Sequence, residues 1–129
     1  DVCSSDLAGF LAHANHYLCS AYACEDNFRV SLPDSFARQA RIKQLIAAEF
    51  GSLTVEKMQR ILADHDGYPT GICRHPHEGH SDPILPNSGR TVAAIVAEPH
   101  RGKFHIASGN ACENPFVEFE LDRCPAKKS

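Results

Sequence analysis

A long stretch rich in proline, glycine and histidine, from Tyr68 to Gly89, divides the sequence into two differently patterned parts. Pro76, Pro83 and Pro86 interrupt regular structure within it, because proline lacks a backbone N–H and fixes φ. Apolar residues recur at helical spacing directly before this stretch and follow strand patterns after it. A chain organised in this way is expected to form a mixed α+β domain that carries a long ordered loop.

Two helices are expected before the loop. Asp34 or Ser35 can cap the first helix, and Gly51 supplies its stop. Thr54 caps the second helix, which we expect to end at Gly67. The short link between them predicts a helical hairpin that must pack on a larger body, since neither helix is stable alone. The apolar stripes comprise Phe36, Ile42, Leu45, Ile46, Phe50, Val55, Met58, Ile61 and Leu62.

Strand patterns lie towards both ends of the sequence. The first is expected to run into a polar turn at Asn15 and His16, and the second is apolar throughout, as in a strand buried on both faces. A hairpin around Gly102 joins the second strand to the third, and the fourth alternates apolar and acidic residues, which indicates one wet face. The expected strands are Gly9–Leu18, Thr91–Ala97, Phe104–Ser108 and Val117–Leu121.

Composition excludes several classes of protein. A formal net charge of −3 over 129 residues gives no reason to expect nucleic acid or an anionic membrane as partner. The sequence contains no apolar run of about 18 residues and no secretory signal, so we expect a cytoplasmic protein. No Cys-x-x-Cys pair occurs, which argues against a zinc ribbon or a disulfide scaffold. The cysteines are Cys3, Cys19, Cys24, Cys73, Cys112 and Cys124.

The loop contains the densest group of potential metal ligands. Imidazoles at His75, His77 and His80, beside a thiol at Cys73, could bind Zn²⁺. Against this stands the lack of a second ligand pair, which structural zinc sites usually have, and solvated histidines are the alternative interpretation. The whole group comprises His65, Cys73, Arg74, His75, His77, His80 and Asp82.

Three further positions have possible roles in chemistry. Asn15, at a strand end, can present its NH₂ group to an oxyanion, although asparagine there is also a common turn former. Arg38 and Arg41 share a side of their helix and could hold a carboxylate in a fork, or they could simply be solvated. Cys112 lies in a tight turn, GNACEN, but has no neighbouring base in sequence.

An ordered set of short motifs is more specific than any single residue. Together they resemble the acyl-coenzyme A:6-aminopenicillanic acid acyltransferase family, which includes isopenicillin N acyltransferase and related autoproteolytic hydrolases. The resemblance covers Gly9 to Leu121. The motifs are H-x-N-H at His13–His16, S-x-x-R-x-x-R at Ser35–Arg41, L-T-x-E-x-M at Leu53–Met58, D-H-x-x-x-P at Asp64–Pro69, I-C-R-H at Ile72–His75 and G-N-x-C at Gly109–Cys112.

The resemblance implies an N-terminal nucleophile (Ntn) hydrolase fold, in which two antiparallel sheets stack between helical layers in an αββα order. It also implies a precursor that cuts itself before a cysteine, whose thiol then attacks a small-molecule amide or acyl thioester. Asn15 would be the oxyanion donor, and the substrate-binding residues would be His16, Arg38, Arg74 and His75. The resemblance implies neither a cofactor nor a metal.

This chain departs from the family pattern at the nucleophile. The family's self-cleaving cysteine lies well upstream of the H-x-N-H motif, and no cysteine here takes that place relative to the matched motifs. We therefore expect this chain alone to be inactive, and its partner to be the missing N-terminal part of the same precursor. A zinc-binding module built on Cys73–His80 and a non-catalytic interaction domain remain the alternatives.

The two ends of the chain are interpreted separately. The opening, DVCSSDL, matches the translated end of a common sequencing adapter, so residues 1–7 are interpreted as a non-native, adapter-derived segment. Residues 8–122 would then be the C-terminal part of an Ntn-hydrolase domain, and residues 123–129 a tail.

Overall fold

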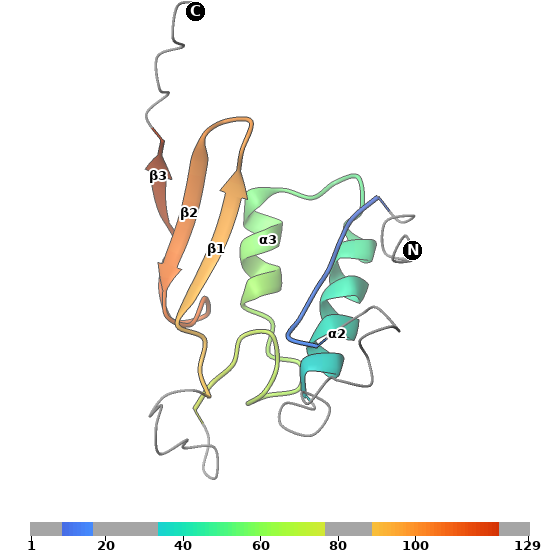
Figure 1. Cartoon of the computed structure of the whole chain (residues 1–129). Coiled ribbons are helices and arrows are strands. Elements are labelled where there is room, and N and C mark those ends of the chain that lie inside the picture. Colours follow the sequence, from blue (N-terminus) through green and yellow to red (C-terminus); the bar gives the residue numbers. More distant parts are fainter. Residues whose placement is uncertain (1–8, 17–33, 77–88, 122–129) are drawn as a thin grey trace, which may run out of the picture.

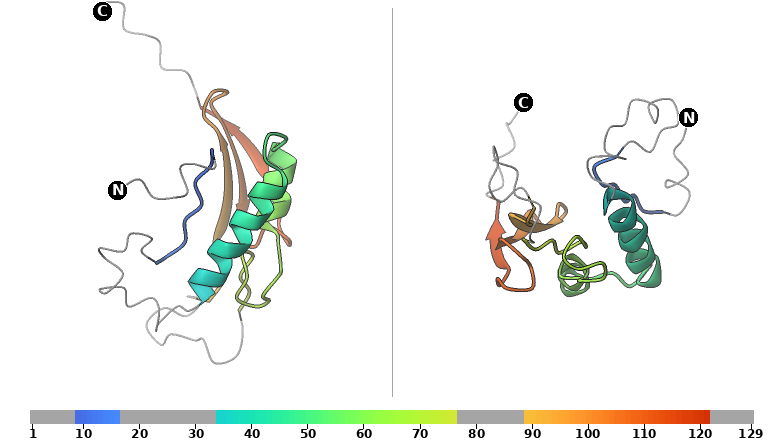
Figure 2. Two further views of the ribbon diagram at one scale, coloured as in Figure 1. Left: turned by 90° about the vertical axis from the view of Figure 1, so that its right-hand side faces the viewer. Right: turned by 90° about the horizontal axis from the view of Figure 1, so that it is seen from below.

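The computed structural model describes residues 9–16, 34–76 and 89–121, and these form a mixed α+β structure. Helix α3 lies between the sheet and α2, and residues 9–16 run along α2 on the same side of the two helices as the sheet (Figures 1 and 2). The α+β class expected from the sequence is confirmed. The elements are α2 (Asp34–Ala48), α3 (Val55–Leu62), β1 (Ala93–Glu98), β2 (Lys103–Ser108) and β3 (Val117–Glu120).

Helix α3 begins as its sequence predicts and ends earlier. The side chain of Thr54 caps it by accepting a hydrogen bond from the backbone N–H of Lys57 at 3.3 Å. Ile61 is buried on the helix, which packs against β1. The helix stops at Leu62 rather than near Gly67: Ala63 leaves the helical conformation, with φ of −92° and ψ of 4°, and the N–H of Asp64 bonds to the carbonyl of Ile61 in a tighter turn.

Helix α2 buries a polar face. Ser35 and Gln39 are its buried residues, whereas the expected apolar stripe is only partly covered and Phe50 is 60% exposed. Asp34 and Ser35 lie inside the first turn instead of preceding it, and the helix ends at Ala48. A turn follows that ends at Gly51, whose φ of +79° suits glycine. Residues 9–16 explain the polar face, since they supply hydrogen-bonding partners for it.

Residues 9–16 are not the strand that their pattern predicts. Residues 17 and 18 lie outside the described residues. Side chains of α2 take the place of a neighbouring strand in this segment: the carbonyl of Ala12 accepts from Gln39 Nε2 at 3.2 Å, and the N–H of Asn15 donates to Ser35 Oγ at 2.9 Å. These two backbone groups are therefore satisfied without a ladder.

The three strands form an antiparallel sheet in the order β1-β2-β3. The hairpin between β1 and β2 turns at Gly102, as expected, with φ of +67°. Ala94 and Val96 are buried on the face of β1 that packs on α3, but Ile95 is 55% exposed. The prediction of a strand buried on both faces is therefore wrong for this chain. Its apolar run places alternate residues on the opposite face.

That opposite face, which we term the open sheet face, is apolar. The strand register aligns Ile95 with Ile106 and Ile106 with Val117, so the three lie in one row across the sheet. Phe104 pairs with Phe119 in the adjacent row. Val117 is 52% and Phe119 51% exposed, and no described element covers this face.

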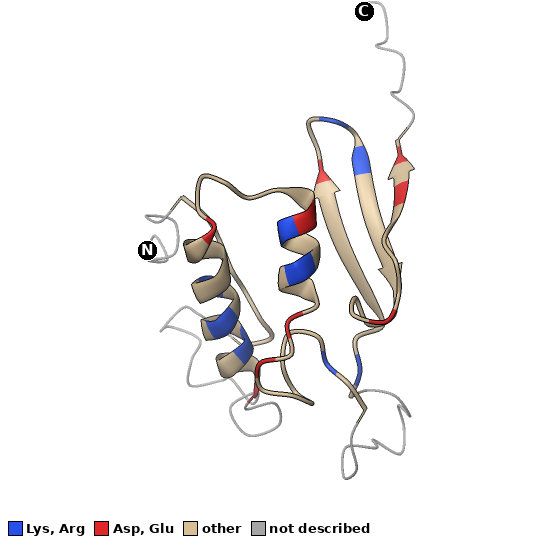
Figure 3. Cartoon of the chain, turned by 180° about the vertical axis from the view of Figure 1, so that it is seen from behind, with Lys and Arg blue, Asp and Glu red and all other residues tan. Residues whose placement is uncertain are grey.

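Charged residues of both signs occur along the helices and the hairpin (Figure 3). On the sheet, Lys103 Nζ lies 2.6 Å from Glu118 and 3.2 Å from Glu120, and these carboxylates raise the pKa of Lys103. Neither described helix has the length and apolarity needed to cross a lipid bilayer.

The ion pair between Arg41 and Asp64 joins α2 to the segment that follows α3. Arg41 donates to both carboxylate oxygens of Asp64, at 2.8 and 3.0 Å, and this hydrogen bonding holds the pKa of Asp64 below its usual value. We expect Asp64→Asn to lower the free energy of unfolding at neutral pH by about 1–2 kcal/mol, since hydrogen bonds between charged groups are lost. Urea unfolding monitored by circular dichroism measures this change.

The contribution of Asp64 to the free energy of unfolding changes with pH in a defined direction. Because the pKa of Asp64 is lowered in the folded state, its contribution is complete above the unfolded value of about 3.9 and disappears as the pH falls through the folded value. The difference between the two proteins should therefore shrink below about pH 4. Asp66→Asn is the matched control. Asp66 also pairs with Arg41, but it is 66% exposed and its carboxylate lies farther away, at 3.3 Å. Equal losses in both variants would contradict this assignment.

Candidate active site and a cysteine-histidine cluster

Four of the five sequence-predicted site residues gather at the first turns of α2. We term this group the α2 polar network. It draws side chains from three segments that are distant in sequence: residues 15–16, α2 and the loop residue Arg74. His75, the fifth predicted residue, lies elsewhere. The network comprises Asn15, His16, Asp34, Ser35, Arg38, Gln39 and Arg74.

His16 is buried at 3% exposure and is held on both ring nitrogens. Nε2 lies 2.9 Å from Gln39 Oε1, and Nδ1 lies 2.8 Å from Ser35 Oγ. Since the Gln39 amide donates to Ala12, its oxygen faces His16 and requires a proton on Nε2. The ring also stacks on Phe36 at 3.8 Å between centroids. These contacts favour a role in fixing the segment around Asn15 over direct contact with a substrate.

Asn15 has an exposed side chain whose orientation is determined by its partner. Arg38 Nη2 donates to Asn15 Oδ1 at 2.9 Å. Because guanidinium has only donors, the oxygen of the amide must face Arg38. The NH₂ group of Asn15 then points elsewhere, and within the described part of the chain it has no hydrogen-bond acceptor. The structure therefore presents a free, oriented N–H donor at the position that the sequence indicates.

Asp34 binds two arginines of the network. Its Oδ2 lies 3.1 Å from Arg38 Nε and 3.1 Å from Arg74 Nη1. The side chains of Asp34 and Arg74 are only 11% and 12% exposed. Arg74 Nε is buried and has no hydrogen-bond partner among the described residues. Asp34 is thus the ion-pair partner that the described residues provide for a mostly buried cation, and it also fixes the arginine that orients Asn15.

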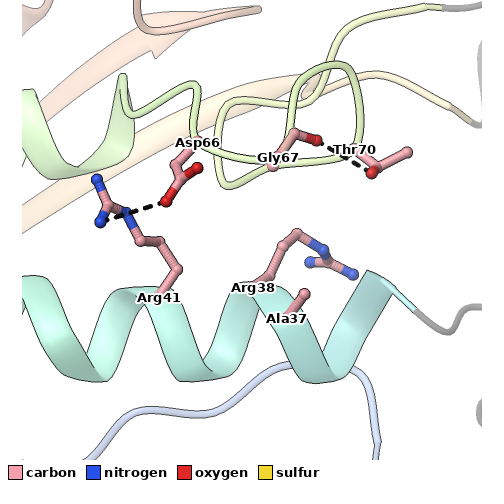
Figure 4. A pocket seen from close by; sticks show the side chains of 7 residues that line it. Ala37, Arg38, Arg41, Asp66, Gly67 and Thr70 are labelled. Atoms are coloured by element: carbon pink, nitrogen blue, oxygen red, sulfur yellow. Dashed lines mark hydrogen bonds and ion pairs between the residues drawn. The ribbon is translucent and has the colours of Figure 1, made fainter.

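A hollow of about 150 Å³ lies between α2 and the turn at residues 66–71 (Figure 4). Both Arg38 and Arg41 line it, as their spacing predicts. Arg41, however, is already paired with Asp64 and Asp66, so it is not free to share a ligand carboxylate with Arg38. The two-arginine fork is therefore not available in this structure.

His75 belongs to a second group, which we term the Cys/His cluster. It comprises His65, Cys73, His75 and Cys112, whose ligand atoms all lie within 4.8 Å of one another. Cys73 is fully buried, His75 is mostly buried, and His65 and Cys112 are exposed. His77 and His80, the other predicted zinc ligands, lie outside the described residues.

Polar neighbours surround the Cys/His cluster. Asn110 Nδ2 donates to Cys73 Sγ at 3.4 Å and to the carbonyl of Arg74 at 2.7 Å. A carboxylate oxygen of Glu113 lies 3.5 Å from His75 Nδ1. Although Cys112 is exposed as a residue, desolvation of its sulfur and the contact with Cys73 raise its pKa to about 11. A thiol with so high a pKa is a poor nucleophile at neutral pH, which agrees with the sequence-based assessment of Cys112.

Sequence reasoning grouped His65 with Cys73 and His75 but missed Cys112. The two cysteines are 39 residues apart, and nothing in the local pattern of GNACEN indicates which segment it meets. The sequence signal that was available was a Cys-x-His spacing in one segment, together with a single cysteine in the turn of another segment.

No known family model and no curated protein sequence matches this chain. A functional interpretation therefore depends on the motifs and on the geometry of the α2 polar network and the Cys/His cluster. The first offers a preoriented N–H donor whose partner Arg38 lines a hollow, and the second offers two sulfur and two nitrogen ligands.

Proposed function

We propose that this chain is part of an autoproteolytic cysteine-nucleophile acyltransferase or amide hydrolase, in which Asn15 Nδ2 donates to the oxyanion. The observation that supports it most directly is the contact between Arg38 and Asn15, since it turns the amide so that its NH₂ group is free. Preorganised donors of this kind stabilise the charge that develops on a carbonyl oxygen under attack.

The reaction consists of two acyl transfers. An N-terminal cysteine, contributed by the precursor upstream of Ala8, attacks an amide or thioester carbonyl, and its own α-amino group accepts the thiol proton. The leaving amine or thiol departs with a proton, which gives a thioester to the cysteine. An amine or water then attacks this thioester, and the acyl group leaves the enzyme. In both steps the negatively charged oxygen of the tetrahedral intermediate accepts a hydrogen bond from Asn15 Nδ2.

The remaining predicted site residues act around this donor. Arg38 lines the hollow beside α2 and adds positive charge where a substrate would enter. Arg74 acts through Asp34, which it shares with Arg38, and His16 acts through Ser35 on the backbone of Asn15. His75 acts only indirectly, since it belongs to the Cys/His cluster.

The open sheet face supports the finer part of the fold proposal. An Ntn hydrolase stacks two antiparallel sheets between helical layers, so one face of each sheet packs on the other sheet. Here α3 covers one face, while the other presents Ile95, Val117 and Phe119, each more than half exposed. We assign a second sheet of the same precursor to this face, which would complete the αββα order.

Intact mass of the full precursor tests the proposal. The gene is expressed from its own start codon, and the product should separate into two chains, of which one begins with cysteine. Replacing that cysteine with alanine should leave the precursor uncut. An uncut wild-type precursor without an upstream cysteine would remove the nucleophile and with it the proposal.

A further inference from the structure

We propose that His65, Cys73, His75 and Cys112 bind one Zn²⁺ ion in a closed tetrahedral site. Two thiolates and two neutral imidazoles are a ligand set that zinc commonly adopts in structural sites. Two thiolates also balance the charge of the ion, so the site as a whole is neutral. The family resemblance implies no metal, and the proposal is independent of the acyl-transfer function.

Four of the six separations between ligand atoms are close to those of a tetrahedral zinc site, and the other two are within 4.8 Å. Bonds of about 2.3 Å to sulfur and about 2.0–2.1 Å to nitrogen, at tetrahedral angles, place sulfurs about 3.8 Å apart, nitrogens about 3.3 Å apart and mixed pairs about 3.6 Å apart. The two sulfurs are 3.5 Å apart and the two Nε2 atoms 3.0 Å apart. His75 Nε2 lies 3.7 Å from Cys73 Sγ and 3.3 Å from Cys112 Sγ.

Two residues beside the proposed zinc ligands lie where outer-shell partners of a metal ion usually lie. Glu113 lies beside Nδ1 of His75, the nitrogen opposite the one that faces the cluster. A carboxylate at that place fixes the ring and raises its basicity as a ligand. Asn110 directs an N–H at Cys73 Sγ, which would stabilise a thiolate there. These two residues complete the arrangement around the ion.

The ion would join three segments of the chain. His65 follows α3, Cys73 and His75 belong to the loop, and Cys112 lies in the turn between β2 and β3. Exposure of His65 and Cys112 leaves an entry path for the ion. Because Arg74 lies between two ligands, the site would also fix the loop that places Arg74 against Asp34.

Two other arrangements share residues with the proposed site. The close approach of Cys73 and Cys112 would also suit a disulfide after oxidation, although two histidines at ligand distance have no role in a disulfide. A zinc site of His75, His77 and His80 was the sequence-based alternative. The experiment below separates both from the proposed site.

Zinc content and cobalt spectra of the reduced full chain test the proposal. We expect one Zn²⁺ per chain after dialysis, and Co²⁺ should give the intense visible absorption of a four-coordinate ion with a sulfur-to-cobalt charge-transfer band. Cys112→Ser and His65→Ala should each weaken zinc binding, measured against a competing chelator, by more than about 100-fold, since loss of an outer partner alone costs about 10- to 100-fold. Both residues are exposed, so folding should survive.

The controls are His100→Ala, which removes an exposed histidine from the β1–β2 turn, and the double variant His77→Ala/His80→Ala. Both should bind zinc as the unmodified chain does. Zinc binding that is lost in the double variant and kept in Cys112→Ser would overturn the proposed ligand set. A Cys73–Cys112 disulfide in the freshly purified chain, with no zinc bound after reduction, would overturn the site itself.

Discussion

Replacing Asp34 with alanine is expected to lower the free energy of unfolding of this chain by about 3–5 kcal/mol. Removing one partner of a mostly buried ion pair leaves the other charge without compensation. Arg74 is 12% exposed, and its Nε already lacks a partner among the described residues. The Asp34 carboxylate also lies in the first turn of α2, where negative charge stabilises a helix. A loss of this size is a large part of the stability of a small domain.

Two further variants identify the cause of this loss. Asp34→Asn keeps an acceptor for one arginine and should cost less than Asp34→Ala. Adding Arg74→Met to Asp34→Ala removes the uncompensated charge, so it should recover part of the lost stability. Denaturant unfolding of the unmodified chain, Asp34→Ala, Arg74→Met and the double variant gives the coupling energy. A double variant that is less stable than Asp34→Ala alone would show that the cost does not come from the stranded Arg74 cation.

Elements specified by local signals were predicted well. The cap of α3 at Thr54, the hairpin turn at Gly102 and the position of β3 each depend on residues within a few positions of one another. The expectation of a single wet face on β3 is wrong, because all four of its residues are exposed. Such signals are short-range, so a single sequence contains them. The α+β class followed from the order of these elements.

Elements that depend on distant partners were predicted less well. Residues 9–16 have a strand pattern, but their backbone bonds to Ser35 and Gln39 of α2, and the same two residues make the buried face of that helix polar. The Cys/His cluster needs Cys112 beside Cys73, a contact that no local spacing specifies. In the α2 polar network, the motif identified Asn15 and Arg38, but only the structure shows that one orients the other.

If Asn15 donates to the oxyanion, Asn15→Ala should lower kcat of the cleaved precursor by about 10²- to 10³-fold, the effect of removing one such donor. The value of KM should change less, because the interaction forms mainly in the transition state. Hydrolysis of a panel of chromogenic acyl anilides measures both constants. His100→Ala, in an exposed turn outside the α2 polar network, should leave both unchanged.

Asn15→Asp separates a catalytic role from a structural one. A carboxylate at residue 15 would still accept from Arg38, and the added charge would pair with it, so stability should be kept or increased. The same carboxylate cannot donate to an oxyanion and would repel it, so kcat should fall at least as far as in Asn15→Ala. Because the side-chain shape is conserved, a fall in kcat without a fall in stability can arise only from the lost N–H donor and the added negative charge. An Asn15→Asp enzyme that keeps wild-type kcat would contradict the assignment of Asn15 and leave its contact with Arg38 as a purely structural feature.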